Sequence, residues 1–394
     1  MEEWKKYKIG DLCSISSSKR IFAKEYQSSG VPFFRGKEII EKQKGESIST
    51  ALYISRSRYD EIKIKYGVPK EGDMLLTSVG TLGTPYIVKN ENFYFKDGNL
   101  TWFSDFKGLN SKFLYYWFLS PIAKNAIEAK AIGSTQKALT IDALSKFEIN
   151  IPDIDTQNRI ASVLSFIDDK IELNRRINDN LEQQAQALFN YYFIDTPELL
   201  GGFSIGSLAD AANYVNGLAM QKYRPINSEK GLPVLKIKEL GQGKIDSSSD
   251  FCSNEIDSYY KIYDGDVIFS WSGTLMVKIW CGGKCGLNQH LFKVSSKTTP
   301  KWFYYFWTKH HLDNFIRIAK DKAVTMGHIK RGELEKAEVL FPNNSVMKKL
   351  DTLMAPFLDQ IIEKECEIRK LALLRDTLLP KLISGELAIN DINN

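Results

Sequence analysis

The sequence predicts an α+β protein with two pseudo-symmetric globular domains of mixed helix and strand, separated by two long helices that form an antiparallel coiled coil. The first supporting observation is an internal repeat, in which residues 113–117 recur as residues 303–307 at an offset of 190. The second is a pair of apolar stripes with heptad spacing, one after each copy. A repeat of this length indicates two domains, because solenoid repeats span only about 20–50 residues.

The repeat divides the chain into four expected parts. Residues 1–152 form a first recognition domain, residues 153–195 a central spacer helix, residues 196–343 a second recognition domain, and residues 344–394 a distal spacer helix with a C-terminal tail. The globular parts carry an excess of Lys and Arg, with net charges of +6 and +4, whereas the helical parts carry −4 and −1. This asymmetry favours an anionic partner on the globular parts.

The composition places the chain among proteins of a reducing compartment. The first nine residues are charged and do not read as a signal peptide. The longest apolar run, residues 113–123, contains a proline and is too short to span a bilayer. Five cysteines, an odd number, fit a reducing cytoplasm better than a disulfide framework. We therefore expect a soluble cytoplasmic protein without a membrane partner.

Each copy is expected to begin with strands and turns and to continue into helices. Alternating or β-branched runs after Gly-Asp turns predict strands over residues 74–79, 86–88, 267–271 and 277–280. Aromatic-rich runs predict buried helices over residues 113–126 and 302–318. A loop, a short helix and a last strand follow, and that strand ends at Pro152 in one copy and Pro342 in the other.

The heptad stripes after those prolines are the clearest signal in the chain. Their apolar and polar seam positions are Ile160, Leu164, Ile167, Ile171, Asn174, Asn178, Leu181, Leu188, Leu350, Met354, Phe357, Ile361, Ile368, Leu371 and Leu378. About 36 residues make a helix of roughly 54 Å. A seam so narrow needs a partner helix, and the other copy is the nearest one, although core helices of ordinary domains are an alternative.

Three residue types qualify the helical prediction. Pro356 should kink the second helix or mark a restart, and Pro380 followed by Gly385 is a stop signal. Asn174 and Asn178 interrupt the first seam. Buried asparagines would cost stability and fix the register of the pair, whereas asparagines at the edge of the pair would stay hydrated.

A search for catalytic motifs yields none. The sequence contains no phosphate-binding loop, no glycine-rich dinucleotide fingerprint, no nucleophile elbow and no motif of amino-methylating enzymes. Cys281 and Cys285 with His290 suggest a zinc site, but a turn between strands is the favoured interpretation, because a second ligand pair is missing. We therefore expect no catalytic residue, no metal and no cofactor in this chain.

Binding residues recur in both copies. Arg35 and Lys37 align with Lys236 and Lys238, and a spacing of two on extended segments would point both side chains of a pair to one face. Loops before the last strand offer hydroxyl, amide and cationic groups suited to phosphates and base edges. For each residue alone, a solvated surface side chain is the alternative. The candidate DNA-binding residues are Lys19, Arg20, Arg35, Lys37, Arg56, Arg58, Thr135, Gln136, Lys137, Lys222, Arg224, Lys236, Lys238, Trp271, Ser272, Thr325, Met326 and His328.

With these features, the chain resembles the specificity subunit of type I restriction–modification enzymes over essentially its whole length. Residues 155–164 (DTQNRIASVL), continuing to residues 181–182, look like the central spacer helix of that family. Residues 378–387 (LLPKLISGEL) look like its distal end. The opening residues 4–12 and the two Gly-Asp strand starts also fit target recognition domains.

The resemblance implies a concrete function. Each recognition domain would read one half of a bipartite site in double-stranded DNA, and the helices would fix the gap and dock two modification (methyltransferase) subunits. Those partners would use S-adenosylmethionine, and restriction subunits would add ATP-driven translocation and Mg-dependent cleavage. The chain itself would be a non-catalytic component of a site-specific deoxyribonuclease and adenine methyltransferase complex. The alternative is a two-domain coiled-coil scaffold or adaptor that binds proteins rather than DNA.

Overall fold

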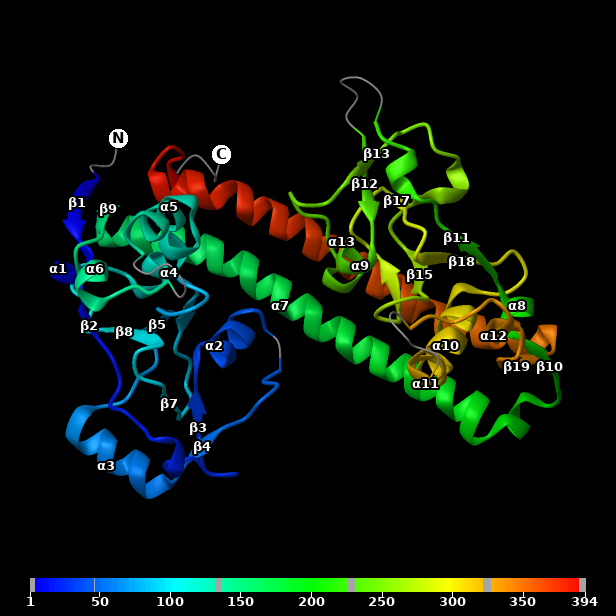
Figure 1. Ribbon diagram of the computed structural model, residues 1–394, viewed down its shortest axis with the longest axis horizontal. Coiled ribbons are helices and arrows are strands. Elements are labelled where there is room, and N and C mark those ends of the chain that lie inside the picture. The colour runs from blue at the N-terminus through cyan, green and yellow to red at the C-terminus, as the bar shows by residue number, and fades with distance from the viewer. Residues whose placement is uncertain (1–3, 46, 132–136, 226–230, 322–326, 390–394) are drawn as a thin grey trace. The chain divides into compact units, whose positions relative to one another are not determined.

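The computed structural model divides the chain into two compact units. Unit 1 comprises Met1–Glu172 with Ala372–Asn394, and unit 2 comprises Leu173–Leu371 (Figure 1). The structure describes residues 4–45, 47–131, 137–225, 231–321 and 327–389. Two long helices, α7 (Ile154–Asn190) and α13 (Asn344–Ser384), each contribute one segment to each unit.

Unit 1 contains three small sheets. A four-stranded antiparallel sheet has the order β2-β8-β5-β6, a three-stranded sheet has the order β4-β3-β7, and β1 pairs with β9. The strands are β1 (Lys5–Lys8), β2 (Ser14–Ser16), β3 (Val31–Phe34), β4 (Tyr53–Ile54), β5 (Met74–Thr77), β6 (Pro85–Ile87), β7 (Tyr94–Phe95), β8 (Leu100–Ser104) and β9 (Glu148–Ile151). The shorter helices are α1 (Ile9–Leu12), η1 (Ala23–Glu25), α2 (Gly36–Gln43), α3 (Arg56–Tyr66), α4 (Ser111–Leu119), α5 (Pro121–Lys130) and α6 (Ile141–Ser145).

Unit 2 repeats this plan. Its sheets have the orders β11-β18-β15-β16, β13-β12-β17-β14 and β10-β19. The strands are β10 (Phe203–Ser207), β11 (Asn213–Asn216), β12 (Leu232–Leu235), β13 (Phe251–Cys252), β14 (Lys261–Ile262), β15 (Asp266–Ser270), β16 (Met276–Trp280), β17 (Cys285–Leu287), β18 (Leu291–Ser295) and β19 (Glu338–Pro342). The shorter helices are η2 (Tyr191–Asp195), η3 (Pro197–Leu200), α8 (Leu208–Ala211), η4 (Met220–Lys222), α9 (Ile237–Gln242), η5 (Ser258–Tyr260), α10 (Lys301–His310), α11 (Leu312–Asp321) and α12 (Gly332–Glu335).

The two units share strand pairing that the sequence repeat did not specify. In unit 1, β3 runs parallel to β7, and in unit 2 the equivalent β12 runs parallel to β17. Each of these parallel pairs is followed by an antiparallel strand of the larger sheet, β8 or β18. The expected fold class, two pseudo-symmetric α+β domains with long helices, is confirmed.

Each expected aromatic helix is divided in two, which corrects the prediction of continuous helices over residues 113–126 and 302–318. In unit 1 the break falls at Ser120, whose backbone is extended (φ −72°, ψ 157°) because a residue before proline disfavours the helical conformation. The Ser120 hydroxyl accepts a hydrogen bond from the backbone N–H of Ala123 and caps the second helix. In unit 2 the break falls at His311, between α10 and α11.

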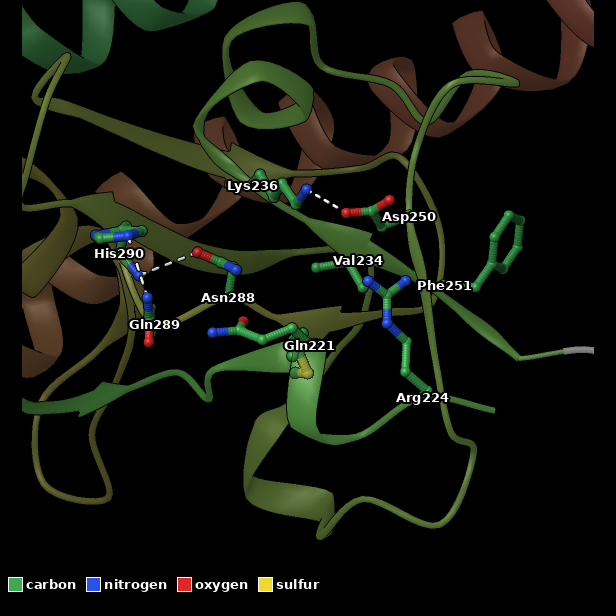
Figure 2. A pocket seen from close by; sticks show the side chains of 10 residues that line it. Gln221, Arg224, Val234, Lys236, Asp250, Phe251, Asn288, Gln289 and His290 are labelled. Carbon is green, nitrogen blue, oxygen red and sulfur yellow. Dashed lines mark hydrogen bonds and ion pairs between the residues drawn. The ribbon is translucent and has the colours of Figure 1, made fainter. Parts of the chain in front are cut away.

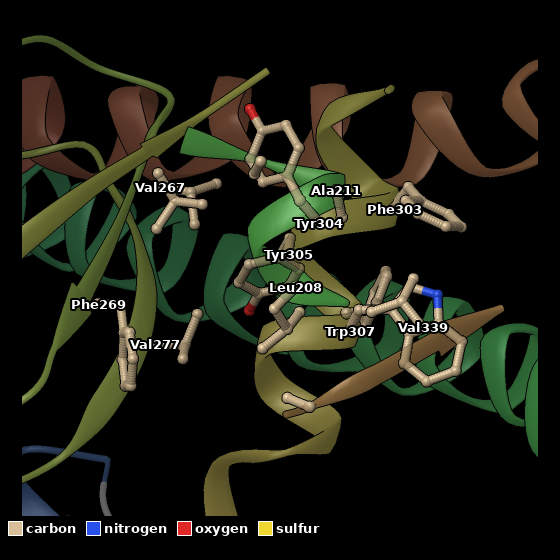
Figure 3. Close-up of a cluster of buried hydrophobic side chains, with 14 of the residues drawn as sticks. Leu208, Ala211, Val267, Phe269, Val277, Phe303, Tyr304, Tyr305, Trp307 and Val339 are labelled. Atoms are coloured by element: carbon tan, nitrogen blue, oxygen red, sulfur yellow. The ribbon is translucent and has the colours of Figure 1, made fainter. Parts of the chain in front are cut away.

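The core of unit 2 is formed mainly by α10 and its neighbours. Figure 3 shows side chains from α8, α10, β15, β16 and β19 meeting in one buried cluster. Phe303, Phe306 and Trp307 of α10 are buried, and they pack against Phe189 at the end of α7 and Phe193 of η2. The aromatic run that defined the repeat is therefore the element that anchors α7 in this unit.

In unit 1 the start of α7 is held by polar side chains of the motif that suggested the family. Asp153 accepts a hydrogen bond from the backbone N–H of Thr156 at 3.0 Å and so caps the helix. Gln157 is fully buried, and its amide nitrogen donates to the carbonyl oxygens of Gly108 (3.1 Å) and Pro152 (2.9 Å). Its amide oxygen accepts from the backbone N–H of Asn110. Gln157 thereby ties the helix to the loop before α4.

Within unit 1, segments of α7 and α13 pair antiparallel. Arg375 Nη1 donates to Asp168 Oδ1 at 2.8 Å, and Ile160 shares a buried cluster with Leu382. Positions later in α7 therefore meet positions earlier in α13. Arg375, a cation in the expected apolar seam, is accommodated because Asp168 lies opposite and also accepts from the Tyr116 hydroxyl at 2.8 Å.

Within unit 2 the two helices are antiparallel as well. The Asn178 amide nitrogen donates to Glu365 Oε1 at 2.9 Å, while Phe189 shares the core cluster with Leu350 and Met354. α13 is one helix through Pro356, so of the two expected outcomes, a kink or a restart, the restart does not occur. The helix ends at Ser384 before Gly385, whose φ is +77°. None of the helices among the described residues is long and apolar enough to cross a membrane.

The seam positions differ in burial along the helices. The buried ones are Ile160, Leu164, Ile167, Ile171, Asn174, Asn178, Leu350 and Met354. The partly exposed ones are Leu181, Leu188, Phe357, Ile361, Ile368, Leu371 and Leu378. Near the end of α7 the buried residues are Ala185 and Phe189, because this end packs on α10 as well as on α13.

Asn174 is expected to weaken the fold, whereas Asn178 stabilises it. Asn174 is 0% exposed, and neither polar atom of its side chain has a hydrogen-bond partner among the described residues. The Asn178 oxygen is likewise buried without a described partner, but the Asn178 amide nitrogen donates to Glu365. An unsatisfied buried amide costs about 1–3 kcal/mol, so Asn174→Leu should raise the free energy of unfolding by about that amount. Asn178→Leu, the matched control, should lower it, because Glu365 then loses its partner. Chemical denaturation measures both, and equal effects of the two variants would contradict this assignment.

Candidate nucleic-acid interface

The same three segments converge in each unit. In unit 1 Val79, after β5, forms an isolated antiparallel bridge with Ala138, which precedes the last strand. In unit 2 Ser272, after β15, forms the equivalent bridge with His328. The third segment is residues 96–99, between β7 and β8, in unit 1 and residues 288–290, between β17 and β18, in unit 2. Ser78 N–H donates to Asn99 O at 2.8 Å, and Ser272 Oγ lies 3.0 Å from His290 Nδ1.

In unit 2 this convergence brings together three of the predicted residues, Trp271, Ser272 and His328. The Trp271 ring lies 6.2 Å from the His328 ring and 6.2 Å from the His290 ring. Its indole N–H donates to Asn216 Oδ1 at 3.0 Å. His290 and Asn216 were not predicted as binding residues, and His290 had been considered only as a zinc ligand.

A cavity of about 300 Å³ adjoins this cluster, and His290 is common to both (Figure 2). Its walls are formed by Met220, Gln221, Arg224, Val234, Lys236, Asp250, Phe251, Asn288, Gln289 and His290. Only Arg224 and Lys236 of these were predicted from sequence. The others were not predicted: Val234 and Phe251 lie on β12 and β13, and an isolated Gln or Asn in a loop carries no sequence pattern.

Arg35, Lys37, Lys236 and Lys238 occupy helix starts, which corrects the expectation of extended segments. Arg35 and Lys236 are the N-caps of α2 and α9, and Lys37 and Lys238 lie in the first turns. Glu38, which is 0% exposed, accepts from the Arg35 backbone N–H at 2.8 Å and from its guanidinium. Glu239 accepts from the Lys236 backbone N–H at 3.2 Å. The recurrence of these cations therefore reflects a repeated capping arrangement as well as any binding role.

Several predicted cations form ion pairs within unit 2. Lys236 Nζ pairs with Asp250 across the cavity, and this hydrogen bond lowers the pKa of the Asp250 carboxyl. Lys238 Nζ lies 3.0 Å from Asp246, whose pKa is lowered by hydrogen bonds from Ser248 and Lys238. Both carboxylates therefore stay charged at neutral pH and compete with phosphate for these two lysines.

Predicted cations of unit 1 are paired too. Arg20 Nε donates to Asp97 at 2.9 Å, Lys19 lies 4.6 Å from the centre of the Tyr66 ring, and Lys37 donates to Thr50 at 3.3 Å. On α3, Arg56 pairs with Asp60 at 3.1 Å. Arg58 pairs with Glu25 at 3.0 Å and with Glu61 at 2.8 Å. In Figure 1, α3 lies at the other end of unit 1 from α4 and α5.

The remaining predicted residues divide into two groups. Thr135, Gln136, Thr325 and Met326 lie outside the described residues. Lys137, Lys222 and Arg224 are exposed, and their side chains have no hydrogen bond or ion pair with any described residue. These three cations are the ones most available to a polyanion.

The described residues contain no group of three or more His, Cys, Asp or Glu side chains that could hold a metal ion. Cys281 and Cys285 flank the turn between β16 and β17, and both thiols are buried. Burial raises the pKa of the Cys281 thiol to about 12 and also raises that of Cys285, so both stay protonated at neutral pH. They behave as small core side chains.

Two similar units, each with polar loops converging on a shared scaffold and each built on a segment of both long helices, define a two-domain recognition protein. The chain belongs to the family of type I restriction modification DNA specificity domains, whose model matches residues 1–183 and again residues 201–374. Subunits of this kind recognise DNA for a type I restriction–modification complex and are its non-catalytic part.

Individual relatives agree with this assignment. The chain is 26% identical to the type I restriction enzyme MjaIX specificity subunit of Methanocaldococcus jannaschii, over 99% of this chain and 95% of that protein. It is 36% identical to a putative type I restriction enzyme specificity subunit, S.HindORF215P, of Haemophilus influenzae, over 50% of this chain and 47% of that protein. The S subunit of a type I restriction–modification system from M. genitalium has the same fold, with a TM-score of 0.61 at 16% identity over 97% of this chain and 96% of that one.

Proposed function

We propose that each globular domain of this specificity subunit reads one half of a bipartite site in double-stranded DNA through its three converging loops. The observation that carries the proposal is that the same bridge is built twice, between Val79 and Ala138 and between Ser272 and His328, from different side chains. A shared scaffold with different loop chemistry suits two readers of different base sequences, because base edges in the major groove are distinguished by donor and acceptor patterns.

The loop chemistry of the two units differs at equivalent places. In unit 1 the converging loops contain an ion pair between Arg20 and Asp97. Unit 2 places amides there, among them Gln221 and Gln289, together with the Trp271 ring. The globular parts both carry net positive charge, which supports contact with the phosphate backbone in both half-sites. Lys137, Lys222 and Arg224 are our proposed phosphate contacts, and the paired lysines Lys236 and Lys238 would contact DNA only by exchanging their carboxylate partners.

We further propose the assembly that the resemblance implies. The two long helices set the distance between half-sites and dock two modification subunits, which bring S-adenosylmethionine to adenines. Restriction subunits add ATP-driven translocation and Mg-dependent cleavage, in the cytoplasm. In this proposal the two recognition domains are residues 1–152 and 196–343, and the spacer helices lie in residues 153–195 and 344–394. A protein-binding scaffold is not favoured, because the family and the named relatives are DNA specificity proteins.

Salt dependence tests the proposal. The full chain, assembled with its modification subunits, should bind a duplex carrying its methylated motif with an affinity that falls about 10³- to 10⁵-fold between 50 and 200 mM salt, if six to ten phosphates are neutralised. Fluorescence anisotropy measures this slope, with a scrambled duplex for comparison. An affinity that does not change with salt concentration, or that is equal for both duplexes, would contradict sequence-specific DNA binding.

Variants of single cations refine the same titration. Lys222→Ala should reduce the salt slope by about 1 and weaken binding to all duplexes alike, because Lys222 is exposed and lies beside the cavity loop. Lys297→Ala is the matched control, since Lys297 is equally exposed but follows the far end of β18. A larger loss for Lys297→Ala would place the DNA on another face of unit 2.

A further inference from the structure

The cavity of unit 2 is lined by three carboxamides. Gln221 comes from η4, and Asn288 and Gln289 come from the loop between β17 and β18. Figure 2 shows the three side chains on one side of the cavity, with Lys236 and Asp250 across from them. Carboxamides carry both a donor and an acceptor, so a group of them can recognise a partner that presents both.

These amides retain hydrogen-bonding capacity toward the cavity. The Asn288 oxygen accepts from the backbone N–H of His290 at 3.3 Å, and no described residue accepts from its amide nitrogen. The Gln289 amide nitrogen lies 3.3 Å from His290 Nε2, and His290 is held at its other ring nitrogen by Ser272. The Gln221 side chain makes no hydrogen bond with any described residue. Loop residues 288–290 are therefore fixed while Gln221 faces them with both polar atoms available.

An exposed aromatic ring borders the same cavity. Phe251 is 42% exposed at the start of β13, next to Asp250. Val234 and Met220, which are buried, form apolar parts of the wall. The cavity thus offers amides and an apolar surface to the same occupant.

We propose that this cavity reads an adenine·thymine pair in the half-site of the second domain, with Gln221 and Gln289 on the adenine and Phe251 against the thymine methyl group. The inference rests on the proposed function and names the base that one site would select. Adenine presents an N7 acceptor beside an N6 donor in the major groove, the pattern that Asn and Gln match with two hydrogen bonds. Thymine adds a methyl group that apolar side chains contact.

The cations of the cavity are less suited to reading bases. Lys236 is engaged by Asp250, and a lysine or arginine at a base edge would select guanine instead. Arg224 is exposed at the rim of the cavity, a position that favours contact with a phosphate over contact with a base edge. In unit 1 the corresponding loops carry the Arg20–Asp97 ion pair, so adenine reading of this kind is assigned to the second half-site alone.

Selection from a randomised duplex library tests the proposal with the full chain assembled with its modification subunits. The half-site that changes on exchange of residues 196–343 should contain, besides the adenine that is methylated, a position where adenine is preferred. Gln221→Ala and Gln289→Ala should each lower that preference by about 5- to 150-fold and leave the other positions unchanged. Gln242→Ala, an exposed amide at the end of α9 outside the cavity, should change nothing.

Thymine recognition is tested on the same selected duplex. Replacing thymine by uracil removes only the methyl group and should weaken binding by about 4-fold, the value of one buried methylene-sized group. Phe251→Ala should abolish that difference, whereas Tyr259→Ala, at a ring that is more exposed and outside the cavity, should preserve it. Thermal unfolding of each variant shows whether the fold is retained.

Several outcomes would overturn the proposal. These are a second half-site in which the methylated adenine belongs to the only A·T pair, equal relaxation at all positions in the glutamine variants, or a guanine preference removed by Arg224→Ala. Wild-type protein that selects no sequence would instead refute the proposed function, so the two failures are distinguishable.

Discussion

Exchanging residues 196–343 for the equivalent domain of a relative is expected to replace one half of the methylated site completely. The other half and the gap should survive, because Val79 and Ala138 in unit 1 form their bridge without any residue of the exchanged segment. Single-molecule sequencing of methylated adenines in cells that carry the chimaera measures the motif. The complementary exchange of residues 1–152 is the matched control and should alter the opposite half.

The exchange also has a structural requirement. The incoming domain must present an aromatic helix to α7, as α10 does here through Phe306 and Trp307. A chimaera that changes both half-sites together would end the assignment of one half-site to each domain. A chimaera that keeps both original half-sites would show that residues 196–343 do not determine the recognised sequence.

Phe189→Ala is expected to cause the largest loss of stability among single substitutions in unit 2, about 3–5 kcal/mol. Phe189 is 0% exposed, and its ring centre lies 5.1 Å from that of Phe193, 5.2 Å from that of Trp307 and 5.6 Å from that of Phe306. Removing the ring leaves a cavity where α7 meets α10. Urea denaturation followed by tryptophan fluorescence reports on this region, because Trp302 and Trp307 lie in the same cluster.

Tyr191→Ala is the matched control for that substitution. Tyr191 is two residues away and 47% exposed, so its removal should cost less than 1 kcal/mol. A loss below 1 kcal/mol for Phe189→Ala would mean that α7 is not anchored on α10 by this ring. A defect confined to the second half-site in the same variant would support a separate role for each domain.

The binding site was only partly predictable. Trp271, Ser272 and His328 were identified because they lie in loops at matching places of the repeat, where the two copies differ, and the structure brings them together. Gln221 and Gln289 were missed because an isolated glutamine in a loop carries no pattern. Their proximity depends on the parallel pairing of β12 with β17, which places η4 and the loop after β17 at one cavity.

The cations show a different limit. Arg35 and Lys236 occupy matching positions in the two copies, but this recurrence does not distinguish a residue that contacts a ligand from one that caps a helix in both copies. Their neighbours Glu38 and Glu239 are buried and complete a capping box at each helix start. The carboxylates three residues later were visible in the sequence, and the capping-box spacing was the signal that would have indicated the structural role.

The sequence by itself determined the repeat and the two long helices, because heptad spacing is a local property that leaves few alternatives. It predicted their antiparallel pairing from the whole domain that lies between them, which permits the chain to return. Tertiary structure alone decided which face of α7 is buried at its end. There Ala185 and Phe189 are fully buried while the predicted seam residue Leu188 is partly exposed. The reason is that this end of α7 packs against α10 as well as α13, and a second packing partner rotates the buried face away from the pure coiled-coil seam.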